Sequence, residues 1–359
     1  MCLLESTAAG LPGPRAVNET TSPSGRPAAV LFGLEGCELS SWERGFFREA
    51  NPTGFILFHR NVSDPEQLLR LTSELREAVG REETPILVDQ EGGRVQRLRP
   101  PHWPSLPAMG VYGELAARDL AAALRGAWLQ ARLIADDLLT VGIDVDCLPC
   151  IDLQVPGAHA VIGDRSFGSD PEIVSQLGKA VCEGLLAGGV APVLKHIPGH
   201  GRATHDSHLS LPHIDADLAS LASDFFPFRQ LSDQGWAMTA HVVLTAIDPH
   251  HPATQSSKVI SEIIRHDIGF GGVLVSDDIN MQALRGPIAE RAAASLAAGC
   301  DLVLHCSGRR EEMEEVASVV QPLSSTGLER LQRATPPAPG KFDRAAALDE
   351  LQSLVGAIS

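Results

Sequence analysis

The stretch DPEIVSQLGKAVCEGLLAGGVAPVLKH, residues 170–196, shows the repeating pattern that decides the fold. Its first part begins with Asp170 followed by proline, a helix-start signal in which the aspartate caps the helix and the proline suits its first turn. The periodic segment 170–189 therefore predicts a helix. The short apolar run 191–196 that comes after it predicts a buried strand, which ends on a lysine and a histidine.

The same alternation extends over most of the chain. A second helix is predicted over residues 64–79, where Asp64 is again followed by proline. The apolar runs that predict strands are residues 28–34, 54–58, 85–90, 143–149, 191–196, 236–243, 271–278 and 301–306. Short strands that alternate with helices predict an α/β fold, a single-domain TIM-type (β/α)8 barrel in which the first strands could be irregular. An open doubly wound sheet is the competing fold, but no G-x-G-x-x-G follows the first strand, which weakens its dinucleotide-binding form.

Composition suggests three regions along the 359 residues. Residues 1–27 are rich in Pro, Ser, Thr and Gly, and we expect a flexible N-terminal arm there. We assign residues 28–320 to the barrel. Residues 321–359 are expected to form a linker, up to about residue 341, followed by a short C-terminal helix and tail.

The charge and hydropathy exclude several classes of partner. A formal net charge of −16 argues against binding to nucleic acid or to an anionic membrane surface. No apolar run reaches the roughly 20 residues of a membrane span, and the N-terminus lacks the basic and apolar regions of a secretory signal. The seven cysteines lie mostly in apolar stretches, which is typical of reduced thiols. These features predict a cytoplasmic protein, which we expect to be a monomer.

Polar residues gather at the carboxyl ends of the predicted strands. In a parallel barrel these ends meet at one mouth, where active sites lie. The polarity of strand ends that approach water explains one or two such residues, but not a set that includes a Lys-His pair and an Asp-Asp pair. The set is Asp89, Asp146, Lys195, His196, His241, Asp277, Asp278 and His305.

The histidine-rich stretch LKHIPGHGRATHDSHLSLP, residues 194–212, needs a chemical explanation. His196 and His200 have helical spacing, but the proline and glycines between them argue against a helix, and no accompanying ligand motif predicts a metal. Asp206 and His208 are better suited to proton transfer, because a carboxylate on one ring nitrogen leaves the other free to carry a proton. An ordinary Asx turn with a solvated histidine remains an open alternative.

A second carboxylate stands in VLVSDDINM, residues 273–281. Asp277 follows an apolar strand directly, so it is expected at the barrel mouth, where an aspartate can act as a nucleophile. The alternative is a helix cap or an ion-pair partner at the strand–helix junction. Asp278 is the better candidate for the cap, and we expect the two neighbours to have different roles.

Taken together, several motifs resemble a known family. They are K-H-I-P-G-H-G-x4-D-S-H (195–208), V-D-Q-E-G-G-R-V-Q-R (88–97), I-G-D-R-S-F (162–167), A-H-V (240–242), S-D-D-I-N-M (276–281) and A-G-C-D-L-V-L (298–304). Their order and spacing are similar to those of glycoside hydrolase family 3, more narrowly its bacterial cytoplasmic β-N-acetylglucosaminidases, or β-hexosaminidases, of peptidoglycan recycling. The resemblance covers roughly residues 28–320. Ile197 and Gln90 replace residues common in the family, which affects expectations about substrate preference rather than the reaction.

The resemblance implies roles for individual residues. Asp277 would be the nucleophile, His208 the general acid/base and Asp206 its partner. The residues that would hold the sugar hydroxyls and the N-acetyl region are Asp89, Arg97, Arg165, Lys195 and His196. No metal and no cofactor are expected.

The expected activity is a retaining hydrolysis of terminal non-reducing β-N-acetylglucosamine. The expected substrates are muropeptide fragments in which N-acetylglucosamine (GlcNAc) is linked to 1,6-anhydro-muramic acid. A phosphorylase remains an alternative, since a neutral histidine would not repel inorganic phosphate. A non-catalytic sugar-binding barrel and a metal-dependent hydrolase are further alternatives.

Overall fold

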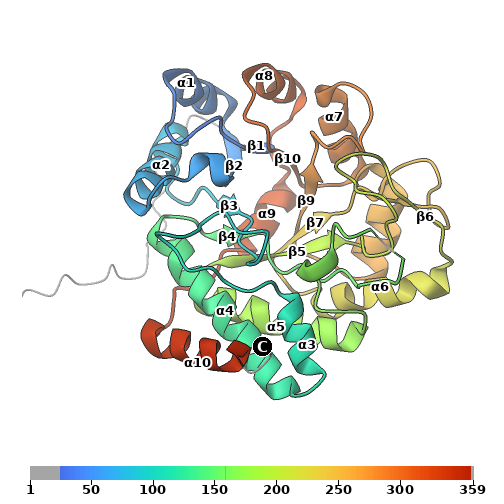
Figure 1. Cartoon of the computed structure of the whole chain (residues 1–359). Helices are drawn as coiled ribbons and strands as arrows, with labels where there is room; N and C mark the ends of the chain where they lie inside the picture. Colours follow the sequence, from blue (N-terminus) through green and yellow to red (C-terminus); the bar gives the residue numbers. More distant parts are fainter. Residues whose placement is uncertain (1–24, 158, 357–359) are drawn as a thin grey trace, which may run out of the picture.

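Parallel strands close into a barrel with helices around it (Figure 1), as the alternating pattern predicts. The computed structural model describes residues 25–157 and 159–356, so most of the expected arm over 1–27 lies outside the described residues. The strands follow one another around the barrel in the order β1-β10-β9-β7-β5-β4-β3-β2. They are β1 Ala28–Phe32, β2 Pro52–Leu57, β3 Ile86–Val88, β4 Val145–Asp146, β5 Ala191–Ile197, β7 Trp236–Thr239, β9 Val273–Asp278 and β10 Leu302–His305.

Each predicted apolar run overlaps one barrel strand, with one difference in the run 236–243. This run divides into β7 and a separate strand β8, Val243–Leu244, which pairs with β6, His213–Ile214, outside the barrel. The first strands are regular apart from one register shift between Ala28 and Leu31. The shortest strand is instead β4, with two residues.

Helices cover the outside of the barrel. Asp64 and Asp170 cap α2 and α5 through their side chains, as their Asp-Pro signals predict. The α-helices are α1 Ser41–Ala50, α2 Pro65–Val79, α3 Gly110–Ala116, α4 Leu120–Thr140, α5 Pro171–Ala187, α6 Leu218–Gln230, α7 Ile288–Ala298, α8 Arg310–Val319, α9 Ser325–Arg333 and α10 Arg344–Gly356. Short 3-10 turns span His59–Asn61, Gly163–Arg165 and Ala253–Gln255, and a π-helix spans Val259–Asp267. No helix within the described ranges is long and apolar enough to cross a membrane.

Alternate residues of the strands build two separate apolar cores. One set points into the barrel and packs there, and the other set packs against the surrounding helices. Leu31 and Val193, for example, belong to the inner core, whereas Val30 and Leu194 belong to the outer core. Both faces of the sheet are buried, which explains why the strands appear in the sequence as continuous apolar runs.

Residues 321–341 are not simply a linker, which corrects the expectation from composition. Leu328 and Leu331 of α9, three residues apart on one helix face, pack against the inner core of the barrel. The neighbouring backbone is tied to the residues before β1, since Leu323 N–H donates to the carbonyl of Pro27 over 2.7 Å. Helix α9 therefore closes the amino-terminal opening of the barrel and leaves the other mouth for chemistry (Figure 1).

The final helix also belongs to the same packed unit. Helix α10 lies along α4, where Arg125 makes a bidentate ion pair with Glu350 at 2.8 Å for both nitrogen–oxygen contacts. The short terminal helix expected from the sequence is thus present, but it is docked on the barrel wall rather than held apart by a linker.

We expect Asp301→Ala to lower the free energy of unfolding by about 3–5 kcal/mol. The buried Asp301 carboxylate accepts from Arg265 and Arg330 at 2.8 Å each and from the backbone N–H of Leu274 at 2.9 Å. Its removal leaves two guanidinium groups unpaired where α9 meets the barrel. Urea denaturation measures the change.

Glu314→Ala is the matched control for this experiment. Glu314 also pairs with an arginine, Arg310, but both side chains are about half exposed. Its loss should cost under about 1 kcal/mol. Equal losses in the two variants would contradict the idea that α9 is anchored through Asp301.

Candidate active site

The polar residues expected at the strand ends do converge at the carboxyl mouth of the barrel. Asp89 directly follows β3, Lys195 and His196 lie near the end of β5, and Asp277 lies near the end of β9. Because adjacent parallel strands end at the same edge, these side chains meet although they are far apart in the sequence.

One group of charges is centred on Lys195, whose side chain is 1% exposed. Its Nζ lies 2.9 Å from an Asp89 oxygen and 2.6 Å from a Glu91 oxygen. Arg97 pairs with the other Asp89 oxygen at 3.0 Å. Arg165 makes a bidentate ion pair with Glu91, with nitrogen–oxygen distances of 2.8 and 2.9 Å. Four of the five residues that the resemblance assigned to sugar binding therefore belong to one network.

Glu91 is a further member of this network, and the resemblance assigned it no role. Burial alone would raise the pKa of Glu91, but the charges of Arg165 and Lys195 outweigh it and lower the pKa to about 2. The same balance, with Lys195 and Arg97 as the main cations, lowers the pKa of Asp89. Both carboxylates are therefore ionised at neutral pH and can accept hydrogen bonds from hydroxyl groups.

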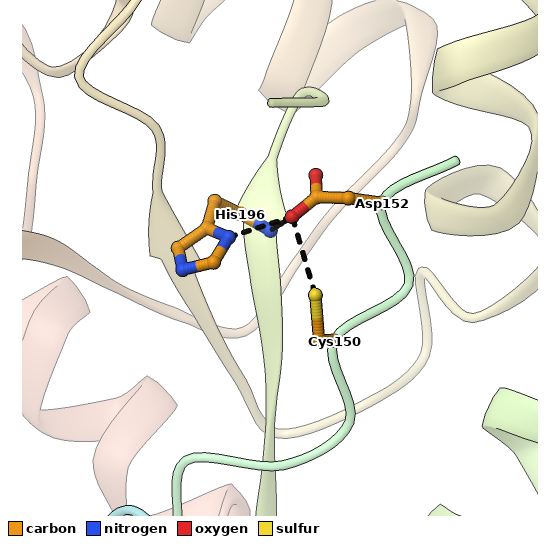
Figure 2. A group of neighbouring side chains, drawn as sticks. All are labelled: Cys150, Asp152 and His196. Atoms are coloured by element: carbon orange, nitrogen blue, oxygen red, sulfur yellow. Dashed lines mark hydrogen bonds and ion pairs between the residues drawn. The ribbon is translucent and has the colours of Figure 1, made fainter. Parts of the chain in front are cut away.

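Asp152 holds the start of the histidine-rich loop, and the sequence reasoning missed it. One carboxylate oxygen accepts from the backbone N–H of His196 at 3.1 Å and lies 2.6 Å from its ring Nδ1. The other oxygen accepts from the N–H of His200 at 2.7 Å. This contact with Nδ1 directs the remaining ring nitrogen of His196 away from Asp152 (Figure 2). The only sequence signal was an acidic residue two positions beyond Cys150.

Asp277 and Asp278 have different surroundings, as expected. Burial would raise the pKa of Asp277, but the positive charges that His241, His196 and His208 can carry, together with the N–H of Asp278, lower it. The nucleophile candidate is thus an ionised carboxylate at neutral pH. A charge on His208 would reach the Asp277 carboxylate, so the two side chains lie near each other.

Asp278 braces the turn after β9 instead of capping a helix, which corrects one expectation. Its Oδ1 accepts from the N–H groups of Asn280 at 3.0 Å and Cys306 at 3.2 Å. Helix α7 begins only at Ile288, so no helix is present for Asp278 to cap. Burial raises the pKa of Asp278 to about 6.

Asp206 and His208 form a side-chain pair in the histidine-rich loop. Asp206 Oδ1 lies 2.9 Å from His208 Nδ1 and also accepts the His208 backbone N–H at 2.9 Å. The Asx turn of the alternative interpretation is therefore present, and it also holds together the side-chain pair that proton transfer would use. The other ring nitrogen of His208 is free to exchange a proton, because 62% of this side chain is exposed.

The loop that carries this pair is docked beside the nucleophile strand. The carbonyls of Ser207 and His208 accept from the N–H groups of Ala283 and Gln282 at 3.3 and 3.4 Å, in the segment that follows β9. His200 braces the loop through the hydroxyl of Ser207 at 3.0 Å. His205 is exposed.

Thermal stability should fall as the pH is lowered from 7 to 5. Burial lowers the pKa of His200 to about 4 and that of His305 to about 4, whereas an unfolded histidine titrates near 6.5. Between these values the unfolded state binds more protons than the folded state, so acidification favours unfolding. Asp278 and Asp146 act in the opposite direction, because burial raises the pKa of both carboxyl groups. Burial also lowers the pKa of a third histidine, His241, so the buried histidines outnumber these two carboxyl groups.

Calorimetry at the two pH values checks this prediction through Tm. His305→Asn should make the dependence on pH shallower, and Asp278→Asn should make it steeper. A Tm that is equal or higher at pH 5 would contradict the assignment of two buried neutral histidines.

The chain is similar to known proteins along most of its length. Residues 39–334 match the family described as "Glycosyl hydrolase family 3 N terminal domain". A "Beta-hexosaminidase" of Alkalilimnicola ehrlichii is 43% identical over 283 residues, which are 77% of this chain and 80% of that protein. One of Neisseria gonorrhoeae is 45% identical over 284 residues, 77% of this chain and 78% of that protein. The crystal structure of NagZ from Neisseria gonorrhoeae with N-trifluoroacetyl-D-glucosamine superposes with a TM-score of 0.82 at 36% identity, covering 94% of this chain and 98% of that one.

Proposed function

Since the chain belongs to glycosyl hydrolase family 3 and is a β-N-acetylhexosaminidase that removes N-acetylglucosamine, we propose that it works by a retaining mechanism in which Asp277 is the nucleophile and His208 the acid/base. One observation carries this proposal. The Asp206–His208 pair lies on a loop that is hydrogen-bonded to the segment directly after the strand of Asp277.

The first step breaks the glycosidic bond. An oxygen of Asp277 attacks the anomeric carbon through an oxocarbenium-like transition state, and a proton from the exposed ring nitrogen of His208 passes to the departing oxygen. In the second step His208 takes a proton from water, whose oxygen displaces Asp277. Asp206, bound to the other ring nitrogen, stabilises the imidazolium in the first half of the cycle and fixes the tautomer in the second.

We propose that the network around Lys195 holds the sugar. Asp89 is 17% exposed, and its ionised oxygens can accept from sugar hydroxyls. Arg97 is 22% exposed, so its guanidinium group can donate to sugar oxygens. Arg165 and Lys195 keep Glu91 and Asp89 in position, and His196, oriented by Asp152, completes the set.

The proposed substrates are peptidoglycan fragments with a terminal β-linked N-acetylglucosamine, in particular GlcNAc linked to 1,6-anhydro-muramic acid with or without its peptide. We propose that the protein acts in the cytoplasm as a monomer. The support is the resemblance in the motifs, the names of the relatives and the acidic composition, which disfavours nucleic acid and anionic membranes as partners.

The test is turnover of that disaccharide and of an aryl β-N-acetylglucosaminide, each with and without inorganic phosphate. We expect free N-acetylglucosamine at a rate independent of phosphate, and NMR should detect the β-anomer first because the configuration is retained. N-acetylglucosamine 1-phosphate as the product would make the protein a phosphorylase. Binding without turnover would make it a sugar-binding barrel, and turnover of the aryl glycoside alone would overturn the proposed substrate.

A further inference from the structure

A buried histidine that the proposed reaction does not use lies beside the end of β9. His241 stands two residues after β7 and is 0% exposed. Its ring Nε2 lies 3.0 Å from the backbone carbonyl oxygen of Asp278, the residue that follows the proposed nucleophile Asp277. Its Nδ1 lies 2.7 Å from the hydroxyl oxygen of Thr254, which is also fully buried. The ring therefore joins the 3-10 turn Ala253–Gln255 to the turn that follows the nucleophile.

The two neighbours of β9 support this turn differently. On the side of β10, the backbone pairing reaches Asp278, and the N–H of Cys306 donates to Asp278 Oδ1 at 3.2 Å. On the side of β7, the paired residues in the described parts of the chain end at Val275. The Asp278 carbonyl also accepts from the N–H of Met281 at 3.1 Å, but this donor belongs to the same turn. His241 therefore supplies the link between the turn and the β7 side of the barrel.

We propose that His241 is a positioning residue for the nucleophile and acts through Asp278. The N–H of Asp278 donates to Asp277 Oδ1 at 2.8 Å, so a shift of Asp278 would change the place of the attacking carboxylate. A misplacement of about 1 Å in an active site can cost about 10²-fold in rate. His241 thus controls the alignment of attack rather than sugar binding, which we assign to the network around Lys195. This role rests on the proposed function, in which Asp277 is the nucleophile.

The contact with Asp278 defines where the ring proton lies. A carbonyl oxygen can only accept, so Nε2 of His241 carries a proton and donates it to Asp278. Burial lowers the pKa of His241, and the charges that His196 and His208 can carry lower it further, although Asp277 acts in the opposite direction. The ring is therefore neutral at pH 7. A neutral ring holds the backbone without forming an ion pair that would weaken the attacking carboxylate.

A chain of hydroxyl groups fixes the other ring nitrogen. In the neutral ring Nδ1 is an acceptor, and Thr254 is its donor. The Thr254 hydroxyl lies closer to Nδ1, at 2.7 Å, than to the carbonyl of Ala240, at 3.1 Å. The hydroxyl of Thr239, 2.7 Å from that of Thr254, can then donate to Thr254. This chain holds the ring plane so that Nε2 faces Asp278.

The kinetic test separates attack by Asp277 from proton transfer. An aryl glycoside with a very acidic phenol needs no proton from His208, so its single-turnover rate of phenol release reports the attack itself. His241→Leu keeps an apolar side chain and removes both ring nitrogens, and we expect this rate to fall about 10²-fold. The dissociation constant for free N-acetylglucosamine should stay unchanged, because the sugar network lies on other strands.

Two amides of different length test the donor itself. The amide of His241→Gln can place an N–H donor where Nε2 stood, and most of the rate should return. The shorter amide of His241→Asn reaches the position of Nδ1 instead, so this variant should remain as slow as His241→Leu. Equal rates in wild type and His241→Leu, or equal losses in the leucine and glutamine variants, overturn the positioning role.

The hydroxyl chain has its own matched pair of variants. Thr254→Val removes the donor to Nδ1 and should slow the same step, though less than His241→Leu. Thr72→Val is the control, because this threonine is equally buried and donates to the carbonyl of Val141 at 2.8 Å, but lies in α2 away from the site. It should match the wild type, and an equal effect of the two substitutions would contradict the chain.

The tautomer is measured on the wild type, so it remains testable if the His241 variants do not fold. Long-range 1H–15N correlation at pH 7 should show a protonated Nε2 and an unprotonated Nδ1 for His241. The opposite tautomer or an imidazolium overturns the positioning role. Near-normal activity of Asp277→Ala would instead count against the proposed nucleophile, whatever the His241 variants do.

Discussion

Replacing Asp277 with alanine is expected to lower kcat by about 10⁴- to 10⁶-fold, the range seen when a member of a covalent catalytic unit is removed. The fold and the sugar network should survive, because the only N–H group of residues 25–157 and 159–356 that donates to this carboxylate is that of its neighbour, Asp278, at 2.8 Å. Activity is measured on the aryl glycoside, and circular dichroism checks the fold.

A chemical rescue separates loss of the nucleophile from general damage. Azide can occupy the space left by the missing carboxylate and attack the anomeric carbon from the same side, so the product of Asp277→Ala should be the α-glycosyl azide. Asp278→Asn is the control, since an amide oxygen can still accept from Asn280 and Cys306; its loss of activity should be far smaller and insensitive to azide. Near-normal activity of Asp277→Ala would remove the nucleophile assignment.

Replacing His208 with alanine should slow hydrolysis of the disaccharide by about 10²- to 10⁴-fold, the usual contribution of general acid–base catalysis. Formation of the glycosyl-enzyme from an aryl glycoside with a very acidic phenol should change much less, because that leaving group departs without a proton. The ratio of the two effects, measured with a series of aryl leaving groups, is the test.

Azide should again accelerate turnover of His208→Ala, but here the product should be the β-glycosyl azide, since Asp277 is still present to form the covalent intermediate. His205→Ala is the matched control, three residues away in the same loop and exposed, and it should behave like the wild type. Equal loss on all leaving groups would assign His208 to binding rather than to proton transfer.

The alternating pattern was sufficient to predict the barrel because burial on both faces of a parallel sheet leaves short continuous apolar runs in the sequence. The Asp-Pro signals located the starts of α2 and α5 for a similarly local reason, since a cap acts within three or four residues. Composition wrongly predicted a linker over residues 321–341, because the segment is rich in Pro, Ser and Thr. Two of its leucines nevertheless pack α9 against the inner core of the barrel.

Some residues of the candidate site could likewise be predicted from the sequence, and others could not. Residue type and spacing singled out Asp206, His208 and Asp277, because an i, i+2 pair and a strand-end carboxylate are local features. Asp152 and Glu91 could not be singled out from the sequence, because their partners lie far away along the chain. Asp152 contacts His196, 44 residues away, and Glu91 pairs with Arg165, 74 residues away.

The sequence by itself thus determined which elements form, which side chains stand at the strand ends and which chemistry those side chains can perform. Only the tertiary structure decided which of them meet: that Asp152 holds His196, that Lys195 joins Asp89 to Glu91, and that the histidine-rich loop docks beside the strand of Asp277. The physical reason is that propensity and capping act over a few residues, whereas pairing of charges and closure of a barrel depend on distances that exist only after the chain has folded.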